Sequence, residues 1–190
     1  LIKYIDYRFL WKFKLYHNQF FRGKLKSEIN HYKNNSISAR FNLDYNRNTV
    51  KFTREAAKKF VEAIANTNRI DISKYFQELY RSKICISPFG WGEICYRDFE
   101  CFQAKSILLK NDISHLETWP KYYQKNITYI PLKLDSSDLL IKINEILDNY
   151  EFFNHIALNG YKKFEKFTSI NFGTNFSCKI KELINIYADN

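Results

Sequence analysis

The chain has 190 residues, which suits one domain that buries a core without disulfides or a bound metal. Its 30 Lys and Arg residues outnumber its 20 Asp and Glu residues, and the net charge of +10 favours anionic partners such as sugar nucleotides, anionic lipid surfaces or nucleic acid. No stretch approaches the roughly 20 consecutive apolar residues of a membrane-spanning helix, so none is predicted.

The opening segment, residues 1–17, is rich in aromatic and basic side chains. Charged residues interrupt it too often for a signal peptide or a transmembrane helix. We expect a strand or helix of the core, and the alternative is a segment that lies on an anionic membrane surface with Phe9, Trp11 and Phe13 inserted. Residues 18–33 follow with an apolar stripe at helical spacing, which predicts a helix.

The next part of the chain leads to the first well-marked strand. Residues 34–48 are polar and rich in Asn and Ser, which predicts a loop. Residues 53–68 have a helical pattern, with Thr53 as the candidate N-cap. A short helix over residues 72–81 then delivers the chain to an apolar, β-branched strand at residues 83–87.

The centre of the sequence predicts one βαβ unit. The strand at residues 83–87 runs into a loop that contains Gly90 and Gly92, then into a helical pattern over residues 93–102, and then into a second apolar strand at residues 107–109. This crossover exceeds the dozen or so residues that a parallel connection needs. Because ligands of open α/β sheets bind outside the carboxyl ends of the strands, the glycine loop is the first place to look for a site.

On an ideal helix the residues of this crossover separate into two faces. Phe99 and Phe102 fall on an apolar stripe that would pack on the sheet, and Glu93, Arg97 and Glu100 recur on another face. One interpretation is a solvated face with two ion pairs. The other is a pair of carboxylates that accept hydrogen bonds from ligand hydroxyls, with Arg97 holding one of them or meeting a phosphate. The flanking glycines and the helix N-terminus favour the second interpretation.

A polar loop at residues 111–120 follows the second strand and contains His115 and Thr118. A loop at the carboxyl end of a strand can meet a substrate, with His115 as a candidate base, although surface loops are usually polar in any case. The remaining patterns predict a strand at residues 128–132 and helices at residues 135–150, 152–167 and 176–187.

The four cysteines, Cys85, Cys95, Cys101 and Cys178, form no CxxC pair. Three of them fall on predicted strands or apolar faces, so we interpret them as reduced core thiols of a cytosolic protein rather than a disulfide framework or a metal site. The histidines show no metal-ligand spacing and no DxD-type acidic pair stands out, so no metal site is predicted.

The segments SPFGWGEICYRDFE, SILLK and SHLETWP, together with the tail LDSSDLLIKINEILDNYEFFNHIALNGYKKFEKF, resemble the carboxyl-terminal lobe of GT-B glycosyltransferases. The resemblance is to the group 1 and spore-protein-like families and covers roughly residues 75–170. It implies an α/β fold, a Rossmann-like parallel sheet flanked by helices, with C-terminal helices. Where the family usually has Gly after the central helix, this chain has Lys105, which adopts a left-handed conformation less easily.

The resemblance also implies a set of site residues. Glu100 matches the acid that contacts the ribose hydroxyls of the donor nucleotide, and Glu93 is the candidate for the acid that faces the donor sugar. We expect catalytic roles for Glu93 and Arg97. The expected substrate-binding residues are Ser87, Gly90, Trp91, Gly92, Glu100, His115 and Thr118.

The function implied by the resemblance is metal-independent transfer of a sugar from a nucleotide sugar to a glycan or lipid-linked acceptor, with no cofactor, in surface glycan synthesis. A cytoplasmic location, contact with the membrane surface and no binding of nucleic acid are expected. Residues 81–190 would form the nucleotide-sugar-binding region, and residues 1–80 the start of the same lobe or a remnant of an acceptor lobe. Because a complete enzyme of this type needs two lobes, we expect a piece of a longer chain, a reduced acceptor half or an inactive copy. The alternative function is a non-catalytic basic α/β module that binds nucleic acid or an anionic membrane surface.

Overall fold

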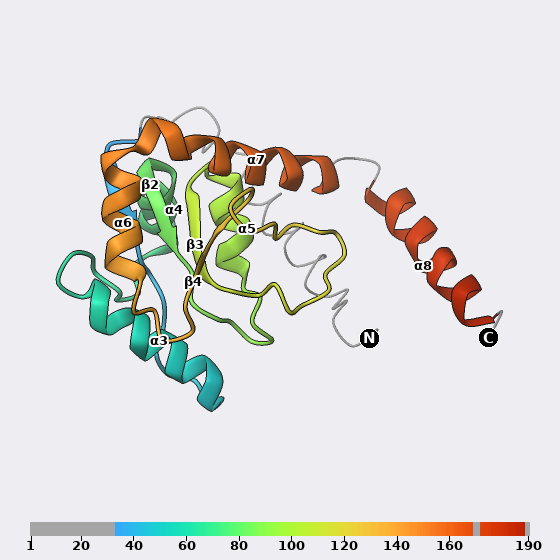
Figure 1. Cartoon of the computed structure of the whole chain (residues 1–190), viewed down its shortest axis with the longest axis horizontal. Coiled ribbons are helices and arrows are strands. Elements are labelled where there is room, and N and C mark those ends of the chain that lie inside the picture. Colours follow the sequence, from blue (N-terminus) through green and yellow to red (C-terminus); the bar gives the residue numbers. More distant parts are fainter. Residues whose placement is uncertain (1–32, 169–171, 189–190) are drawn as a thin grey trace.

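The computed structural model describes residues 33–168 and 172–188. One four-stranded parallel sheet with the order β1-β2-β3-β4 forms its centre (Figure 1). Each strand pairs with the strand that follows it along the chain, so the carboxyl ends of all the strands meet at one edge. The strands are β1 (Asn35–Ser38), β2 (Ser82–Ile86), β3 (Ile107–Asn111) and β4 (Ile130–Leu132). The expected α/β fold, with a parallel sheet flanked by helices, is confirmed.

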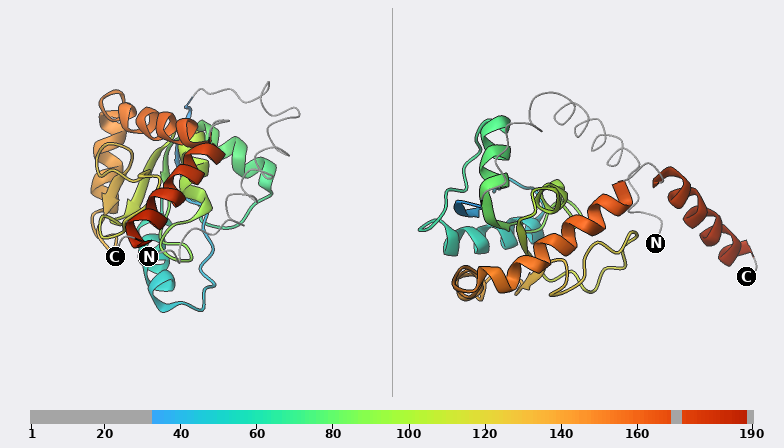
Figure 2. Two further views of the ribbon diagram at one scale, coloured as in Figure 1. Left: turned by 90° about the vertical axis from the view of Figure 1, so that its right-hand side faces the viewer. Right: turned by 90° about the horizontal axis from the view of Figure 1, so that it is seen from above.

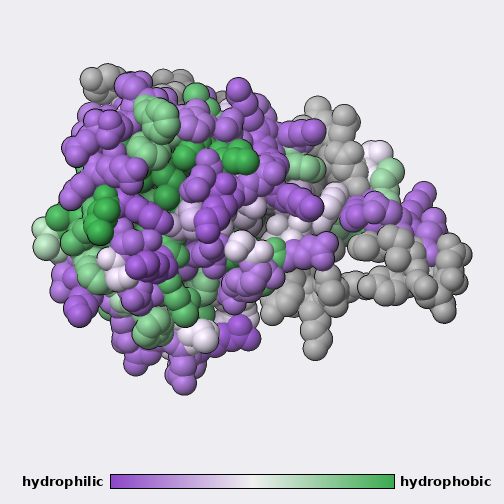
Figure 3. Space-filling view, in the orientation of Figure 1, coloured by the Kyte–Doolittle hydropathy of each residue, from purple (hydrophilic) through white to green (hydrophobic). Residues whose placement is uncertain are grey.

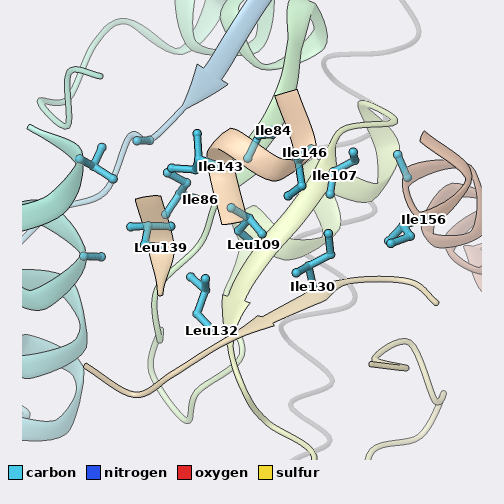
Figure 4. Close-up of a cluster of buried hydrophobic side chains, with 14 of the residues drawn as sticks. Ile84, Ile86, Ile107, Leu109, Ile130, Leu132, Leu139, Ile143, Ile146 and Ile156 are labelled. Carbon is cyan, nitrogen blue, oxygen red and sulfur yellow. The ribbon is translucent and has the colours of Figure 1, made fainter. Parts of the chain in front are cut away.

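Helices cover both faces of the sheet, and the alternation of side chains along the strands explains why. In β2, Ile84 and Ile86 point into one hydrophobic core while Cys85 points into the other. The first core is closed by α3 and α6 (Figure 4). The second is closed by α4, α5 and α7. The helices are α3 (Asn48–Val61), α4 (Ile72–Arg81), α5 (Tyr96–Gln103), α6 (Leu139–Asp148), α7 (Tyr150–Thr168) and α8 (Phe172–Ala188).

Two features at the ends of the fold complete the arrangement. Gly160 lets α7 pack closely on α5, because a Cβ atom at this position would lie 2.6 Å from Cδ1 of Phe102. The last helix, α8, stands apart from the sheet (Figure 2), and its Phe176 ring lies 6.1 Å from the ring of Trp119.

The surface view shows apolar side chains gathered on the side of the molecule where α6 lies (Figure 3), and Ile141 of α6 is 70% exposed.

Several elements lie where the sequence predicts them. The helix at residues 72–81, the strands that become β2, β3 and β4, and the helices that become α6, α7 and α8 are confirmed. The helix α6 begins at Leu139, with Asp138 at the N-cap. The predictions for residues 1–17 and for nearly all of residues 18–33 lie outside the described residues.

Two predictions before β2 are wrong. Residues 34–48 are not all loop, because β1 lies at their start and pairs in parallel with β2. Its Asn35 side chain donates a hydrogen bond to Oγ of Ser82 over 2.7 Å, so polar side chains help to hold this strand. Thr53 is not a helix cap. It lies buried inside α3, which begins at Asn48, and its hydroxyl donates to the carbonyl oxygen of Val50 over 3.1 Å.

The outer side of β4 carries two features that mark an edge strand. Pro131 has no N–H group to offer. The ammonium group of Lys142 on α6 donates to the carbonyl oxygen of Pro131 and lies 2.9 Å from the carboxylate of Asp138. The Lys142 side chain therefore already occupies a backbone acceptor on the outer side of β4.

The interpretation of the cysteines as core thiols holds for two of the four, because Cys95 is half-buried and Cys178 is exposed. Cys85, Cys95, Cys101 and Cys178 are free thiols, and Cys85 and Cys101 are buried in the core. Among the described residues, no helix combines the length and apolar character that crossing a membrane requires.

Candidate functional site

A cleft with a volume of about 1050 Å³ opens at the carboxyl edge of the sheet. One wall is residues 40–43 and Tyr45, which follow β1, together with Arg54 of α3. Another part of the lining is Tyr75 of α4, together with Arg97 in the first turn of α5 and Glu100 one turn later. Since ligands of open parallel sheets bind beyond the carboxyl ends of the strands, this cleft lies where the fold predicts a site.

Glu100 projects from α5 into the lining of the cleft. Its Oε2 atom accepts a hydrogen bond of 2.6 Å from the hydroxyl of Tyr75. Burial raises the pKa of the Glu100 carboxyl, although the Tyr75 hydroxyl and the positive charge of Arg97 act in the opposite direction. A carboxylate held at such a cost in a cleft is typical of a group that accepts hydrogen bonds from a ligand.

Arg97 lies one helical turn before Glu100 and lines the same cleft. Its Nε atom is buried and has no hydrogen-bond partner among the described residues. Burial lowers the pKa of Arg97, but the combined effect of Tyr75, nearby thiols and Glu100 is larger and raises the pKa above its ordinary value. The guanidinium group therefore stays charged. A buried donor without a partner costs about 1–3 kcal/mol, and an anion placed in the cleft would remove that cost.

Arg54 brings a second guanidinium group to the cleft. Its side chain is 3% exposed, and it donates hydrogen bonds to the carbonyl oxygens of Phe89 over 2.8 Å and Asn42 over 2.6 Å. The guanidinium also stacks 4.3 Å from the centroid of the Tyr45 ring. Burial lowers the pKa of Arg54, and the nearby positive charge of Arg97 lowers it as well. No ion pair between Arg54 and a carboxylate occurs within residues 33–168 and 172–188, so the cleft holds positive charge that its own acids do not neutralise.

Asp98 determines where α5 begins, and with it the positions of the cleft residues. Its carboxylate accepts hydrogen bonds from the backbone N–H of Cys95 over 3.1 Å, from the hydroxyl of Ser87 over 2.5 Å and from that of Tyr123 over 2.8 Å. It also lies 3.1 Å from the ammonium group of Lys110, and both charged side chains are fully buried. The helix N-terminus is therefore capped by a carboxylate of the protein itself.

This cap changes the expected geometry of the central helix. The sequence pattern predicts a helix from Glu93 with Arg97 and Glu100 on the same face, but α5 begins at Tyr96. Glu93 lies in the preceding turn with a φ angle of 74°. The prediction that the three residues share one helical face is therefore wrong for Glu93, while Arg97 and Glu100 do line one cleft.

The turn before α5 uses its glycines for internal packing. A Cβ atom on Gly90 would lie 2.4 Å from the Cβ atom of Cys95, so the turn can fold back onto the helix start only because this side chain is absent. Gly92 has a φ angle of 81°, and the N–H of Glu93 donates to the carbonyl oxygen of Gly90 over 3.0 Å. We expected Gly90 to leave room for a ligand next to the backbone, but Cys95 already occupies that space.

The other expected site residues are divided among the interior, the surface and the loop after β3. Ser87 is fully buried beneath the turn, where Asp98 holds its hydroxyl. Trp91 is 68% exposed, and the Arg47 guanidinium lies 4.3 Å from its ring centroid. His115 contacts Glu93 through a distance of 2.8 Å between Nε2 and Oε2, and Thr118 lies half-buried in the same loop.

Three further residues, Arg54, Tyr75 and Asp98, shape this site. Arg54 was not among the predicted site residues, because α3 lies far from the glycine turn in the sequence. Tyr75 lies on α4, and no local pattern indicates that its hydroxyl reaches the cleft. Asp98 has a visible signal, since an acid three residues after the N-cap is the pattern of a capping box, but Cys95 is an unusual cap.

The described residues contain no group of three or more His, Cys, Asp or Glu side chains placed to hold a metal ion. The lining of the cleft is instead cationic and hydroxyl-bearing, which suits a phosphorylated ligand better than a cation.

No family model matches the chain, and no curated protein matches it. Among solved structures, the chain is similar to a crystal structure of the C-terminal domain of a glycosyl transferase group 1 family protein from Francisella tularensis, with a TM-score of 0.42 and 17% sequence identity. The match covers 62% of this chain and 61% of that domain, so this chain spans about three fifths of the length of the domain that it matches.

Proposed function

We propose that this chain is a glycosyltransferase, or the donor-binding part of one, that transfers a sugar from a nucleotide sugar to a saccharide or lipid-linked acceptor in surface glycan synthesis. The observation that carries the proposal is the cleft at the carboxyl edge of the sheet, which Arg54, Arg97 and Glu100 line together. The resemblance of residues 75–170 to the donor-binding lobe of GT-B enzymes points to the same chemistry.

Two parts of a nucleotide sugar, the diphosphate and the ribose, have a matching group in this cleft. The diphosphate is an anion, and Arg97 offers it a buried guanidinium whose Nε atom lacks a partner among the described residues. The ribose hydroxyls are donors, and Glu100 offers carboxylate oxygens beside the Tyr75 hydroxyl. During transfer, negative charge grows on the departing diphosphate, and fixed guanidinium groups in a partly dry cleft stabilise it without a metal.

A glycan or lipid-linked acceptor would approach from the open side of the cleft, and a lipid-linked one would bring the protein to the membrane surface. Whether the chain transfers a sugar by itself depends on the acceptor-binding half, which enzymes of this architecture form from a second lobe.

A thermal-shift panel tests the proposal. Uridine and guanosine diphosphate sugars are added to the chain, and at a ligand concentration of 100 times Kd the expected stabilisation is about 2.7 kcal/mol, which corresponds to several degrees in Tm. Glu100→Gln and Arg97→Gln should abolish the shift. Glu55→Gln, on the exposed face of α3, is the matched control and should keep it.

Two outcomes of this panel would overturn the proposal. One is the absence of any shift with nucleotide sugars. The other is a shift only with oligonucleotides or anionic vesicles, which would favour the basic binding module instead.

A further inference from the structure

A second groove, with a volume of about 750 Å³, lies along the outer side of β4. It is lined by β4, by α6 and by the first turns of α7, and it shares no lining residue with the cleft that contains Arg54 and Arg97. The proposed function uses none of these residues, so the groove calls for a separate explanation.

The helix α6 runs back along β4 and gives the groove two different ends. At the start of α6, the carboxylate of Asp138 accepts a hydrogen bond from the N–H of Lys133 over 3.0 Å. One helical turn later, the ammonium group of Lys142 donates to the carbonyl oxygen of Pro131. The groove therefore extends from the residues that follow β4 to the residues that join α6 to α7.

Each end of the groove presents a large apolar side chain to solvent. Leu134, which follows β4, is 57% exposed, and Phe152, at the start of α7, is 72% exposed. Both line the groove, on the side of the molecule where apolar side chains gather (Figure 3). Exposed apolar groups that gather beside a groove are typical of a surface that binds another protein.

The charge of the groove indicates which protein it suits. Its lining contains as many lysines as acids, namely Lys125, Lys133 and Lys142 against Asp112, Asp138 and Glu145. Nucleic acid and anionic membranes are attracted to cationic surfaces, so a balanced lining does not favour them. Two copies of a chain with a net charge of +10 repel each other, and a face with balanced charge lets them approach with the least repulsion.

Two of these charges have no partner within the chain. The other four form ion pairs, Asp112 with Lys125 over 3.1 Å and Asp138 with Lys142 over 2.9 Å. Lys133 and Glu145 are exposed, and neither forms an ion pair with a residue that the structure describes. Lys133 lies at the Leu134 end of the groove and Glu145 lies toward the Phe152 end. The groove thus has a free positive charge at one end and a free negative charge toward the other.

We propose that this groove is the interface of a symmetric dimer, in which two copies of the chain meet groove to groove. A two-fold axis uses the same surface on both copies, so opposite ends of the groove come together. Leu134 of one copy then packs on Phe152 of the other, and Lys133 of one copy meets Glu145 of the other. The sheets do not join, because Pro131 lacks an N–H group and its carbonyl oxygen is already bound. This inference does not depend on the proposed function.

Sedimentation velocity of the wild-type chain across a wide range of concentrations tests the proposal. A species of twice the 22.9 kDa chain mass should form as the concentration rises. Phe152→Glu and Leu134→Glu each bring a charge into an apolar contact, so each should raise the dissociation constant at least about tenfold. Ile184→Glu is the matched control, because Ile184 is 60% exposed but lies on α8, and it should leave the dissociation constant unchanged.

A charge exchange tests the alignment of the two copies. Lys133→Glu and Glu145→Lys each place like charges opposite one another at both ends of the interface, so each should weaken the dimer at least about tenfold. The double variant should recover the wild-type dissociation constant, which a general loss of stability would not allow. Lys74→Glu, at an exposed position of α4, changes the net charge as much as Lys133→Glu does and should not weaken the dimer.

Three results would decide against this dimer. A wild-type chain that sediments as a monomer at every concentration overturns it and leaves the groove to a different protein or to another lobe of a longer chain. A dimer that Ile184→Glu dissociates and Phe152→Glu does not would have its interface on α8. A double charge variant that dimerises more weakly than either single variant rules out the two-fold alignment. None of these results bears on the binding of a nucleotide sugar.

Discussion

The carboxylate of Asp98 and the ammonium group of Lys110 face each other across 3.1 Å, and solvent reaches neither side chain. The pair joins the first turn of α5 to the carboxyl end of β3, directly beneath the glycine turn. Because Arg97 is the neighbour of Asp98 in the sequence, the position of the cleft residues depends on this buried contact.

The first prediction concerns the stability of this pair. Removing one member leaves a buried charge without a partner, so Asp98→Asn and Lys110→Met should each lower the free energy of unfolding by about 3–5 kcal/mol in urea denaturation. The double variant should lose less than the sum, since it leaves no charge unpaired. Lys125→Met, which breaks the exposed contact with Asp112, should change stability by no more than about 1 kcal/mol. Single variants as stable as the wild type would show that the pair contributes nothing.

The second prediction concerns Glu100 and pH. Because the folded state raises the pKa of Glu100 above its ordinary value of 4.5, protonation of this group favours folding. Its contribution to stability is greatest below pH 4.5 and falls as the pH rises through the raised pKa. Glu100→Gln removes this titration, so the variant should be at least as stable as the wild type at neutral pH, and the difference should vanish in acid. Urea unfolding across this pH range measures it, and a variant that is clearly less stable at neutral pH would contradict the prediction.

The third prediction separates the charge of Arg54 from its shape. Arg54→Lys keeps a cation but cannot reach the carbonyl oxygens of Phe89 and Asn42 together. We expect a loss of about 2 kcal/mol in the free energy of unfolding and a smaller thermal shift with nucleotide sugars. Arg69→Lys, at an exposed position of the same cleft, should stay within about 0.5 kcal/mol of the wild type. Equal effects of the two substitutions would mean that Arg54 acts only through its charge.

The fourth prediction tests the glycine turn. A methyl group on Gly90 would collide with the Cβ atom of Cys95 and the carbonyl oxygen of Ile94. Gly90→Ala should therefore lower the free energy of unfolding by about 1–3 kcal/mol and change the fluorescence of Trp91, which lies in the same turn. The fluorescence change should appear in the folded protein before any denaturant is added. An unchanged spectrum together with unchanged stability would show that the turn has room to spare.

The sequence predicted much of the fold because its signals are local. The β-branched and apolar runs of β2 and β3 and the helical spacing of α6 and α7 each act over a few residues. The strand β1 escaped detection because its sequence, Asn-Ser-Ile-Ser, has the composition of a loop, and only its pairing with β2 makes it a strand.

The site was predicted in part for the same reason. Arg97 and Glu100 lie one turn apart on a helix, so their spacing alone brings them together. Arg54 and Tyr75 reach the cleft through tertiary packing, which no local pattern reports. Glu93 was placed on the helix because a period of 3.6 residues extends smoothly through it, whereas the Asp98 cap begins the helix at Tyr96.

Lys105 adopts, at the end of α5, a backbone conformation that usually favours glycine. The resemblance implies glycine at this position, and the backbone does adopt the left-handed conformation that glycine favours, with a φ angle of 54°. The ammonium group of Lys105 lies 4.4 Å from the centroid of the Tyr161 ring, a contact that offsets part of the strain. The turn after α5 thus forms with a lysine side chain at this position.

The outer side of β4 bears on how the protein behaves at high concentration. A proline and a lysine-bound carbonyl group give a neighbouring molecule little to pair with at that margin, so fibril-like stacking through β4 is disfavoured. An additional lobe in a longer chain, or a separate subunit, would have to attach through helices and loops rather than by lengthening the sheet at that strand.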